Sequence, residues 1–168
     1  MAKNNPLPAD AAPSAALAPS QISAILAIAA DAIIALDDRL HITLFNDGAS
    51  AIFGYSPSEI LGQQLDLLIP ERMRAAHTHH VDEFAVSPVA ARKMGERREI
   101  FARRKDGSEF PAEASIAKHL IDGRMAYMVV LRDVTDRKAA EAALALANTE
   151  LEARVADRTR ALEAEIRR

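Results

Sequence analysis

Three histidines in one short segment have the clearest capacity for chemistry in this chain. They stand at positions 77, 79 and 80, in the string ERMRAAHTHHVDEF of residues 71–84. A neutral imidazole is a common metal ligand. In a helix, successive side chains are about 100° apart, so His77 lies on one face and His79 points away from it. That face is expected to carry Met73, His77, His80, Val81 and Phe84.

A divalent metal site built from all three histidines is not expected. Only His77 and His80 share the face, and no cysteine or carboxylate on it completes the four ligands of a structural zinc site. His77 is therefore predicted to be either a ligand of another kind or a structural histidine that faces a pocket or the solvent.

The composition narrows the function classes further. The sequence contains no glycine-rich phosphate loop, no GxSxG motif, no HExxH motif and no cysteine, so the common nucleotide, hydrolase and thiol sites are not expected. The 21 basic and 24 acidic residues give a formal net charge of −3, unlike the basic surface of nucleic-acid-binding proteins. No apolar run reaches the roughly 18 residues of a membrane span. We expect a cytoplasmic protein that is not an enzyme, binds no nucleic acid and spans no membrane.

The histidine segment must be positioned by a single domain, because 168 residues leave room for one domain and its extensions. Residues 1–19 are rich in Ala and Pro and are predicted to form a disordered tail. A short helix is expected from Ser20, its N-cap, to about Asp31. An antiparallel hairpin follows, with strands in the strings AIIALD and HITLFND.

Short helices are predicted between this hairpin and the histidine segment. Asn46 or Asp47 can cap the first, and Gly54 ends it. The string SPSE of residues 56–59 is a capping box that begins the second. Pro70 opens the helix that carries the histidines.

Three further strands are expected near residues 97–104, 109–118 and 124–132. Asp-Gly pairs at 106–107 and 122–123 mark the tight turns between them. We therefore predict an α+β fold, with one five-stranded antiparallel sheet and helices on one face. Apart from Arg98, the basic residues near the first of these turns are expected to face solvent: Arg97, Arg103, Arg104 and Lys105.

Residues 137–168 contain neither Gly nor Pro and are rich in Ala, Glu, Leu and Arg, which predicts one long helix. Its seam residues recur at heptad spacing: Leu144, Asn148, Leu151, Val155 and Leu162. A polar Asn at such a position fixes the register and favours a parallel dimeric coiled coil. A single solvated helix is the alternative, because only about three heptads are present. The chain then divides into a tail (1–19), a domain (20–136) and a coiled coil (137–168).

Three strings resemble the PAS sensory domains of bacterial signalling proteins in order and spacing: LFNDGASAIFGYSPSEILGQQLDLLIPERMR, RRKDGSEFPAE and MVVLRDVTDRK. The resemblance covers about residues 20–138. It implies a five-stranded antiparallel sheet, a pocket between the sheet and its helices, and a C-terminal helix that leads to a histidine kinase or other output domain. It also implies that Asp133 and Thr135 transmit the signal, because the triplet at 133–135 matches the family's Asp-x-Thr motif.

Within the PAS family, the histidine segment is similar to that of the haem-binding oxygen sensors of the FixL type. The resemblance implies that His77 is the axial ligand of haem iron. Arg98 falls, after one inserted residue, on the position of an arginine that hydrogen-bonds oxygen in those sensors. Met73, Phe84 and Ile116 are then expected to line the cofactor pocket. The absence of cysteine excludes photoreceptors that need a cysteine adduct, whereas a non-covalent flavin or another small ligand stays open.

The sequence thus predicts a signal-sensing PAS module of a two-component-type system. Haem-based oxygen sensing is one hypothesis, with homodimerisation through the PAS domain and the coiled coil. A ligand in the pocket would bias two packings of the sheet and change the pitch or rotation of the coil. The alternative is a cofactor-free PAS module that only dimerises a partner.

Overall fold

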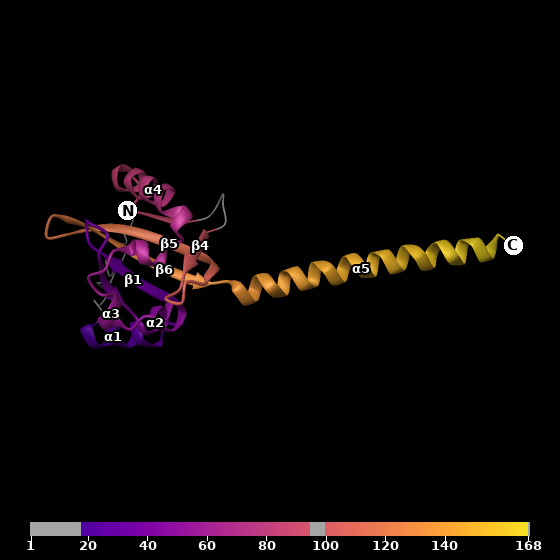
Figure 1. The fold of residues 1–168 in the computed structure, drawn as a ribbon, viewed down its shortest axis with the longest axis horizontal. Helices are drawn as coiled ribbons and strands as arrows, with labels where there is room; N and C mark the ends of the chain where they lie inside the picture. Colours follow the sequence, from indigo (N-terminus) through magenta and orange to yellow (C-terminus); the bar gives the residue numbers. More distant parts are fainter. Residues whose placement is uncertain (1–17, 95–99, 168) are drawn as a thin grey trace, which may run out of the picture.

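The computed structural model describes residues 18–94 and 100–167, and the fold is an antiparallel sheet with helices packed against it (Figure 1). The strands are β1 (Ala32–Leu36), β2 (Ile42–Phe45), β3 (Ala91–Met94), β4 (Ile100–Arg103), β5 (Glu109–Ile121) and β6 (Arg124–Asp133). The α-helices are α1 (Pro19–Ile28), α2 (Asp47–Phe53), α3 (Pro57–Ile60), α4 (Arg74–Val86) and α5 (Thr135–Ile166). Two 3-10 turns, η1 (Leu65–Leu68) and η2 (Glu71–Met73), lie between α3 and α4.

The predicted α+β fold with an antiparallel sheet is confirmed, and the sheet has one more strand segment than the five expected. Its order is β2-β1-β6-β5-β3, and β4 also pairs with β5. The edge next to β5 therefore consists of two segments, of which β3 was not predicted. Its sequence, ARKM, lacks the apolar alternation of a half-buried strand. Residues 97–99 of the predicted strand 97–104 lie outside the described residues.

The β5–β6 hairpin is longer than predicted and projects from the sheet (Figure 1). Its two-residue turn is formed by Asp122 and Gly123, both with positive φ, as the Asp-Gly pair predicted. The neighbouring strand β1 ends opposite Tyr127, and β3 begins opposite Ala117. Beyond these positions, β5 and β6 pair only with each other within the described residues.

Local signals fixed the helix boundaries of the middle segment. The side chain of Asn46 accepts from the backbone N–H of Ala49 over 2.9 Å and caps α2, and Gly54 ends α2 with a φ of 79°. Glu59 accepts from the backbone N–H of Ser56, as the capping box predicted. The predicted N-cap of the first helix, Ser20, is wrong, because the N-cap residue is Ala18, two residues earlier, and α1 begins at Pro19.

The core lies between one face of the sheet and helices α2 to α4. Alternate residues of the strands are buried on this face, among them Ile34, Ile116 and Val129, and they form one cluster with Phe53 and Phe84 of the helices. The rings of Phe53 and Phe110 meet edge to face, with centroids 5.6 Å apart. This contact joins the sheet to α2. The rings of Phe84 on α4 and Tyr127 on β6, with centroids 6.5 Å apart, join the sheet to the helix that carries the histidines.

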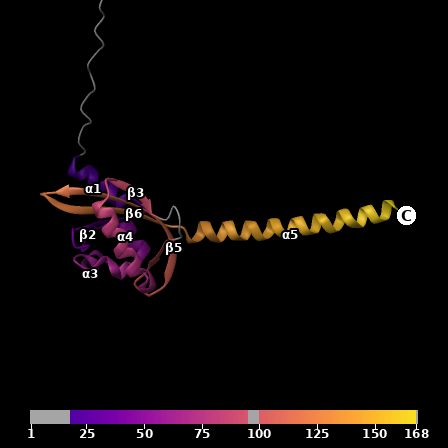
Figure 2. The same cartoon turned by 90° about the horizontal axis from the view of Figure 1, so that it is seen from above.

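Helix α5 leaves the domain at the end of β6 and extends away from it (Figures 1 and 2). It has 32 residues, none of them buried. Its apolar side chains are exposed: Leu144, Leu146, Leu151, Val155, Leu162 and Ile166. Within the described part of the chain, no helix combines the length and the apolar character needed to cross a membrane.

Candidate functional site

Helix α4 presents His77 on the same side as its two buried residues. Val81 and Phe84 are buried, and they follow His77 by four and seven residues. The His77 side chain is half-buried. Burial lowers the pKa of this imidazole, against a smaller opposing effect of the Asp66 carboxylate. Neutral imidazole is thus favoured at this position.

The other two histidines of the segment point to solvent. His79 is exposed, as predicted from its position on the far side of the helix. Its Nε2 lies 3.5 Å from Oε1 of Glu83. The expectation that His80 shares the inward face is wrong, because its side chain is exposed. Three residues turn a helix by about 300°, so His80 is displaced by about 60° from His77. Phe84 is displaced by only about 20°, which explains its burial.

The predicted pocket residues belong to one apolar cluster. Phe84 and Ile116 are fully or nearly fully buried in the core, and Met73 packs against it half-buried. Arg98 lies outside the described residues. No group of three histidine, aspartate or glutamate side chains that could hold a metal ion occurs among the residues with a described placement.

These residues fit haem in the type of donor that they offer. In many haem proteins a neutral imidazole nitrogen holds the iron on its proximal side. Among residues 18–94 and 100–167, the imidazole of His77 has no hydrogen-bond or ion-pair partner that would occupy its nitrogens. Apolar side chains of the core lie on the same side of the helix.

The predicted signal junction is organised by the carboxylate of Asp133. Its Oδ1 accepts from the backbone N–H of Thr135 over 2.9 Å and from the Thr135 hydroxyl over 2.6 Å. Its Oδ2 accepts from Nη2 of Arg104 over 2.5 Å. Burial raises the pKa of Asp133, but the hydrogen bonds from Thr135 and Arg104 outweigh it, so the pKa is lowered. Asp133 is therefore ionised, and in this form its carboxylate binds the first turn of α5.

Arg104 is the site residue that sequence reasoning missed. It was expected to face solvent, as was Arg103, but both side chains are mostly buried, with 28% of the Arg104 side chain and 24% of the Arg103 side chain exposed. The guanidinium of Arg104 also donates to the backbone carbonyl of Ile52 at the end of α2 and lies 4.0 Å from the ring centroid of Phe110. Arg104 therefore connects α2, β5 and the start of α5, and only the spatial proximity of these elements identifies it.

Helix α5 is also held to β5. The backbone N–H of Val134 donates to the carbonyl of Pro111 over 3.1 Å. Arg137, in the first turns of α5, forms an ion pair with Glu113. A displacement of this end of β5 would therefore act directly on the base of the helix.

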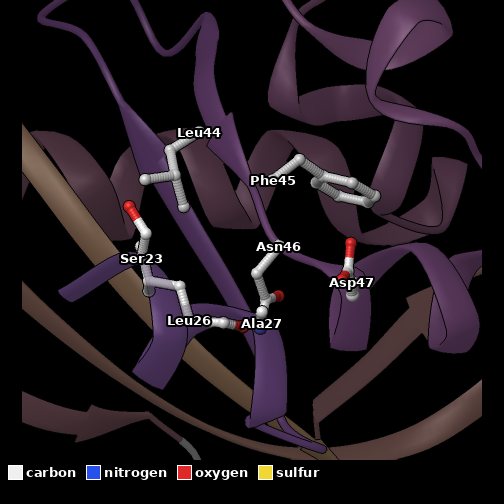
Figure 3. Close-up of a pocket in the computed structure, with 7 residues that line it drawn as sticks. All are labelled: Ser23, Leu26, Ala27, Leu44, Phe45, Asn46 and Asp47. Atoms are coloured by element: carbon white, nitrogen blue, oxygen red, sulfur yellow. Dashed lines mark hydrogen bonds between the residues drawn. The ribbon is translucent and has the colours of Figure 1, made fainter. Parts of the chain in front are cut away.

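A second polar centre lies beside a surface hollow of about 240 Å³ between α1 and the junction of β2 and α2 (Figure 3). Besides capping α2, Oδ1 of Asn46 accepts from the N–H of Ile33 over 2.8 Å. Its Nδ2 donates to the carbonyls of Leu26 and Asp31 over 3.0 and 3.1 Å. Asn46 is buried, and its side-chain amide binds α1 and the segment that follows it to the domain.

This chain is similar in sequence to several curated proteins. The sensor protein FixL of Bradyrhizobium diazoefficiens is 29% identical over 132 residues, which cover 79% of this chain and 26% of FixL. The oxygen sensor protein DosP of Escherichia coli K12 is 28% identical over 102 residues, 61% of this chain and 13% of DosP. The cell-division control histidine kinase PdhS of Brucella abortus is 30% identical over 135 residues, 79% of this chain and 12% of PdhS. The chain thus spans about a quarter or less of the length of these relatives.

The fold and the family agree with these similarities. The PAS domain of an HTR-like protein from Haloarcula marismortui matches the structure with a TM-score of 0.57 at 24% identity, covering 68% of this chain and 89% of that one. A family profile described as a PAS domain matches residues 30–136, which include the whole sheet and the histidine segment. The chain therefore belongs to the PAS domain family, and its similarity is to the sensor domains of signalling proteins.

Proposed function

We propose that this chain is the oxygen-sensing module of a bacterial two-component-type signalling protein, that it binds haem through His77, and that it acts in the cytoplasm as a homodimer. The observation that carries the proposal is the half-buried His77 imidazole, whose lowered pKa favours the neutral, ligating form. The similarity to FixL and to the oxygen sensor DosP supports the same function.

In this proposal each residue has a separate task. Haem, when bound, supplies an iron centre for a diatomic gas. His77 holds the cofactor on α4, and Met73, Phe84 and Ile116 keep water from it. Arg98 donates a hydrogen bond to the gas, a role that rests on the resemblance to oxygen sensors.

The test is the ultraviolet–visible spectrum of the full chain purified with added haem. Wild type should show a Soret band that His77→Ala loses. His79→Ala is the matched control, because His79 is exposed on the same helix, and it should keep the band. Absence of the band in wild type, or a band that His77→Ala leaves unchanged, would contradict haem ligation by His77. Arg98→Ala should keep the band and release oxygen about tenfold faster, as expected for one lost hydrogen bond to a charged donor.

The route of the signal is proposed to run through Asp133 and Thr135 into a dimeric α5. The exposed leucines of α5 support a coiled coil with a second copy, since Leu151 and Val155 are each more than half exposed in the single chain. Leu151→Asp should give a monomer in sedimentation velocity. Ala153→Asp adds the same charge on the opposite side of the helix and should leave the dimer intact. A monomeric wild type would contradict this part of the proposal.

The alternative function is a cofactor-free dimerisation module. The exposed seam of α5 favours it equally, because that seam requires no ligand in the domain. The two functions differ in one measurement. Signalling by an output domain joined to α5 would depend on haem in the first case, and only on the presence of α5 in the second.

A further inference from the structure

The side chain of Lys118 ends on the carboxyl end of α4. Its ammonium donates to the carbonyls of Phe84, Ala85 and Ser87, over 2.5, 2.9 and 2.6 Å. The last carbonyls of a helix have no partner within the helix, and an ammonium has three N–H donors. All three donors of Lys118 are therefore used on one helix end.

A second cation contacts the middle of α4 and the side chain of Phe84. Nη2 of Arg92 on β3 donates to the carbonyl of His80 over 2.9 Å. The guanidinium of Arg92 lies 4.7 Å and Nζ of Lys118 lies 4.9 Å from the ring centroid of Phe84. Lys118 thus lies at the negative end of the helix dipole, and the two cations from neighbouring strands both contact the ring of Phe84, the most deeply buried side chain of α4.

Apolar burial alone attaches α4 weakly. Only Val81 and Phe84 among its 13 residues are buried. The charged hydrogen bonds from Lys118 are each stronger than a neutral hydrogen bond, and they act at the end of the helix. The position of this end is therefore set by β5, to which Lys118 belongs.

The other end of β5 contacts α5. Five residues before Lys118, Glu113 pairs with Arg137 of α5, and the carbonyl of Pro111 accepts from Val134. Five residues of strand span about 17 Å. Strand β5 pairs along this length with β6 and with β3 or β4, so it moves as part of a sheet.

We propose that Lys118 is a positioning residue that couples the carboxyl end of α4 to the base of α5 through β5. This inference rests on the proposed sensing function for its purpose, since α4 carries His77. The coupling itself is a property of the chain without any ligand, and it is tested in that state.

The experiment is hydrogen–deuterium exchange of the full chain without added haem. Lys118→Met removes the three donors and keeps an unbranched apolar side chain. Amides of residues 81–87 should exchange about tenfold faster, as expected for loss of hydrogen bonds to a charged group, and those of residues 135–141 should also exchange faster. Lys93→Met is the matched control, because Lys93 is an exposed lysine on the neighbouring strand, and it should change neither segment.

The combined response decides the outcome. Faster exchange in both segments, with both restored by Lys118→Arg, supports the coupling. Unchanged exchange in residues 81–87, or a change there that leaves residues 135–141 as in wild type, overturns it. Slow exchange in β1 verifies that each variant is folded, and Lys118→Gln is scored in the same way if Lys118→Met fails that check. If the protein binds no haem, the proposed function is contradicted, but the exchange experiment still tests the coupling because it is done without haem.

Discussion

Nη2 of Arg104 donates to Oδ2 of Asp133 over 2.5 Å, and this contact joins the turn after β4 to the last residue of β6. The same carboxylate holds the first turn of α5 through Thr135. The carboxylate of Asp133 therefore binds Arg104 through one oxygen and the first turn of α5 through the other. This arrangement gives the Asp-x-Thr motif a structural role that can be tested separately from ligand binding.

Removal of the guanidinium should weaken the domain at this junction. Arg104→Ala is expected to lower the free energy of unfolding by about 2–3 kcal/mol, because it leaves a mostly buried carboxylate without its cationic partner. The measurement is urea unfolding followed by circular dichroism. Lys105→Ala is the neighbouring control and should change stability little, since its ion pair with Glu59 is exposed. An equal decrease in the free energy of unfolding of the two variants would show that the contact between Arg104 and Asp133 stabilises the domain no more than an exposed ion pair does.

The contribution of Asp133 to the stability of the domain should depend on pH. Because the pKa of Asp133 is lowered from 3.8 in the folded chain, the unfolded chain takes up its proton first as the pH falls. The stabilisation by Asp133 is thus complete above about pH 5 and is lost below about pH 3.8. Urea unfolding of wild type and Asp133→Asn should differ most near neutral pH, and the difference should shrink towards about pH 3. A difference independent of pH would contradict the ionised role of Asp133.

Asn46 should be required both for α2 and for the attachment of α1. Asn46→Ala removes the cap of α2 and leaves the N–H of Ile33 without its acceptor, with an expected loss of about 2–3 kcal/mol in thermal or urea unfolding. Asn46→Asp keeps the accepting oxygen and loses the donor to Leu26 and Asp31. Hydrogen exchange should therefore show α1 released in Asn46→Asp while α2 stays protected. Release of both helices by the Asp variant would be inconsistent with this division.

Gly48 leaves space for the connection between α1 and β1. An added Cβ would lie 2.4 Å from the carbonyl oxygen of Asp31 and 2.5 Å from that of Ala29, which are backbone atoms. Gly48→Ala should displace this connection and speed its cleavage in limited proteolysis. Gly62→Ala is the control, because no atom lies within 4 Å of its added Cβ, although its φ of 79° costs some stability. If Gly48→Ala is cleaved in this connection no faster than wild type, the backbone accommodates the added Cβ without displacing the connection.

The elements that the sequence predicted well are those specified by neighbouring residues. Asn46, Gly54 and the turn at Asp122 are set by side-chain caps and by backbone conformations that few residues adopt. The inward position of His77 and Phe84 follows from helical periodicity for the same reason. Periodicity did not predict the exposure of His80, which is displaced by about 60° from His77, because the width of the buried face depends on the elements that pack against the helix.

The contacts that sequence reasoning missed join distant parts of the chain. Arg104 and Asp133 are 29 residues apart, and Lys118 lies more than 30 residues from the carbonyls of Phe84 and Ala85 that it binds. Nothing in the local sequence separates the mostly buried Arg103 and Arg104 from Lys105, which is exposed beside them. Strand β3 was missed because backbone pairing with β5, rather than an apolar pattern, makes it a strand.

The continuous helix α5 constrains where an output domain can be joined. Its 32 residues extend about 48 Å at 1.5 Å per residue. Every residue inserted into it turns all that follows by about 100°, whereas seven residues return the helix to within about 20° of its original direction. Chimeric proteins joined to this helix should therefore change in activity periodically with linker length, in steps of about seven residues.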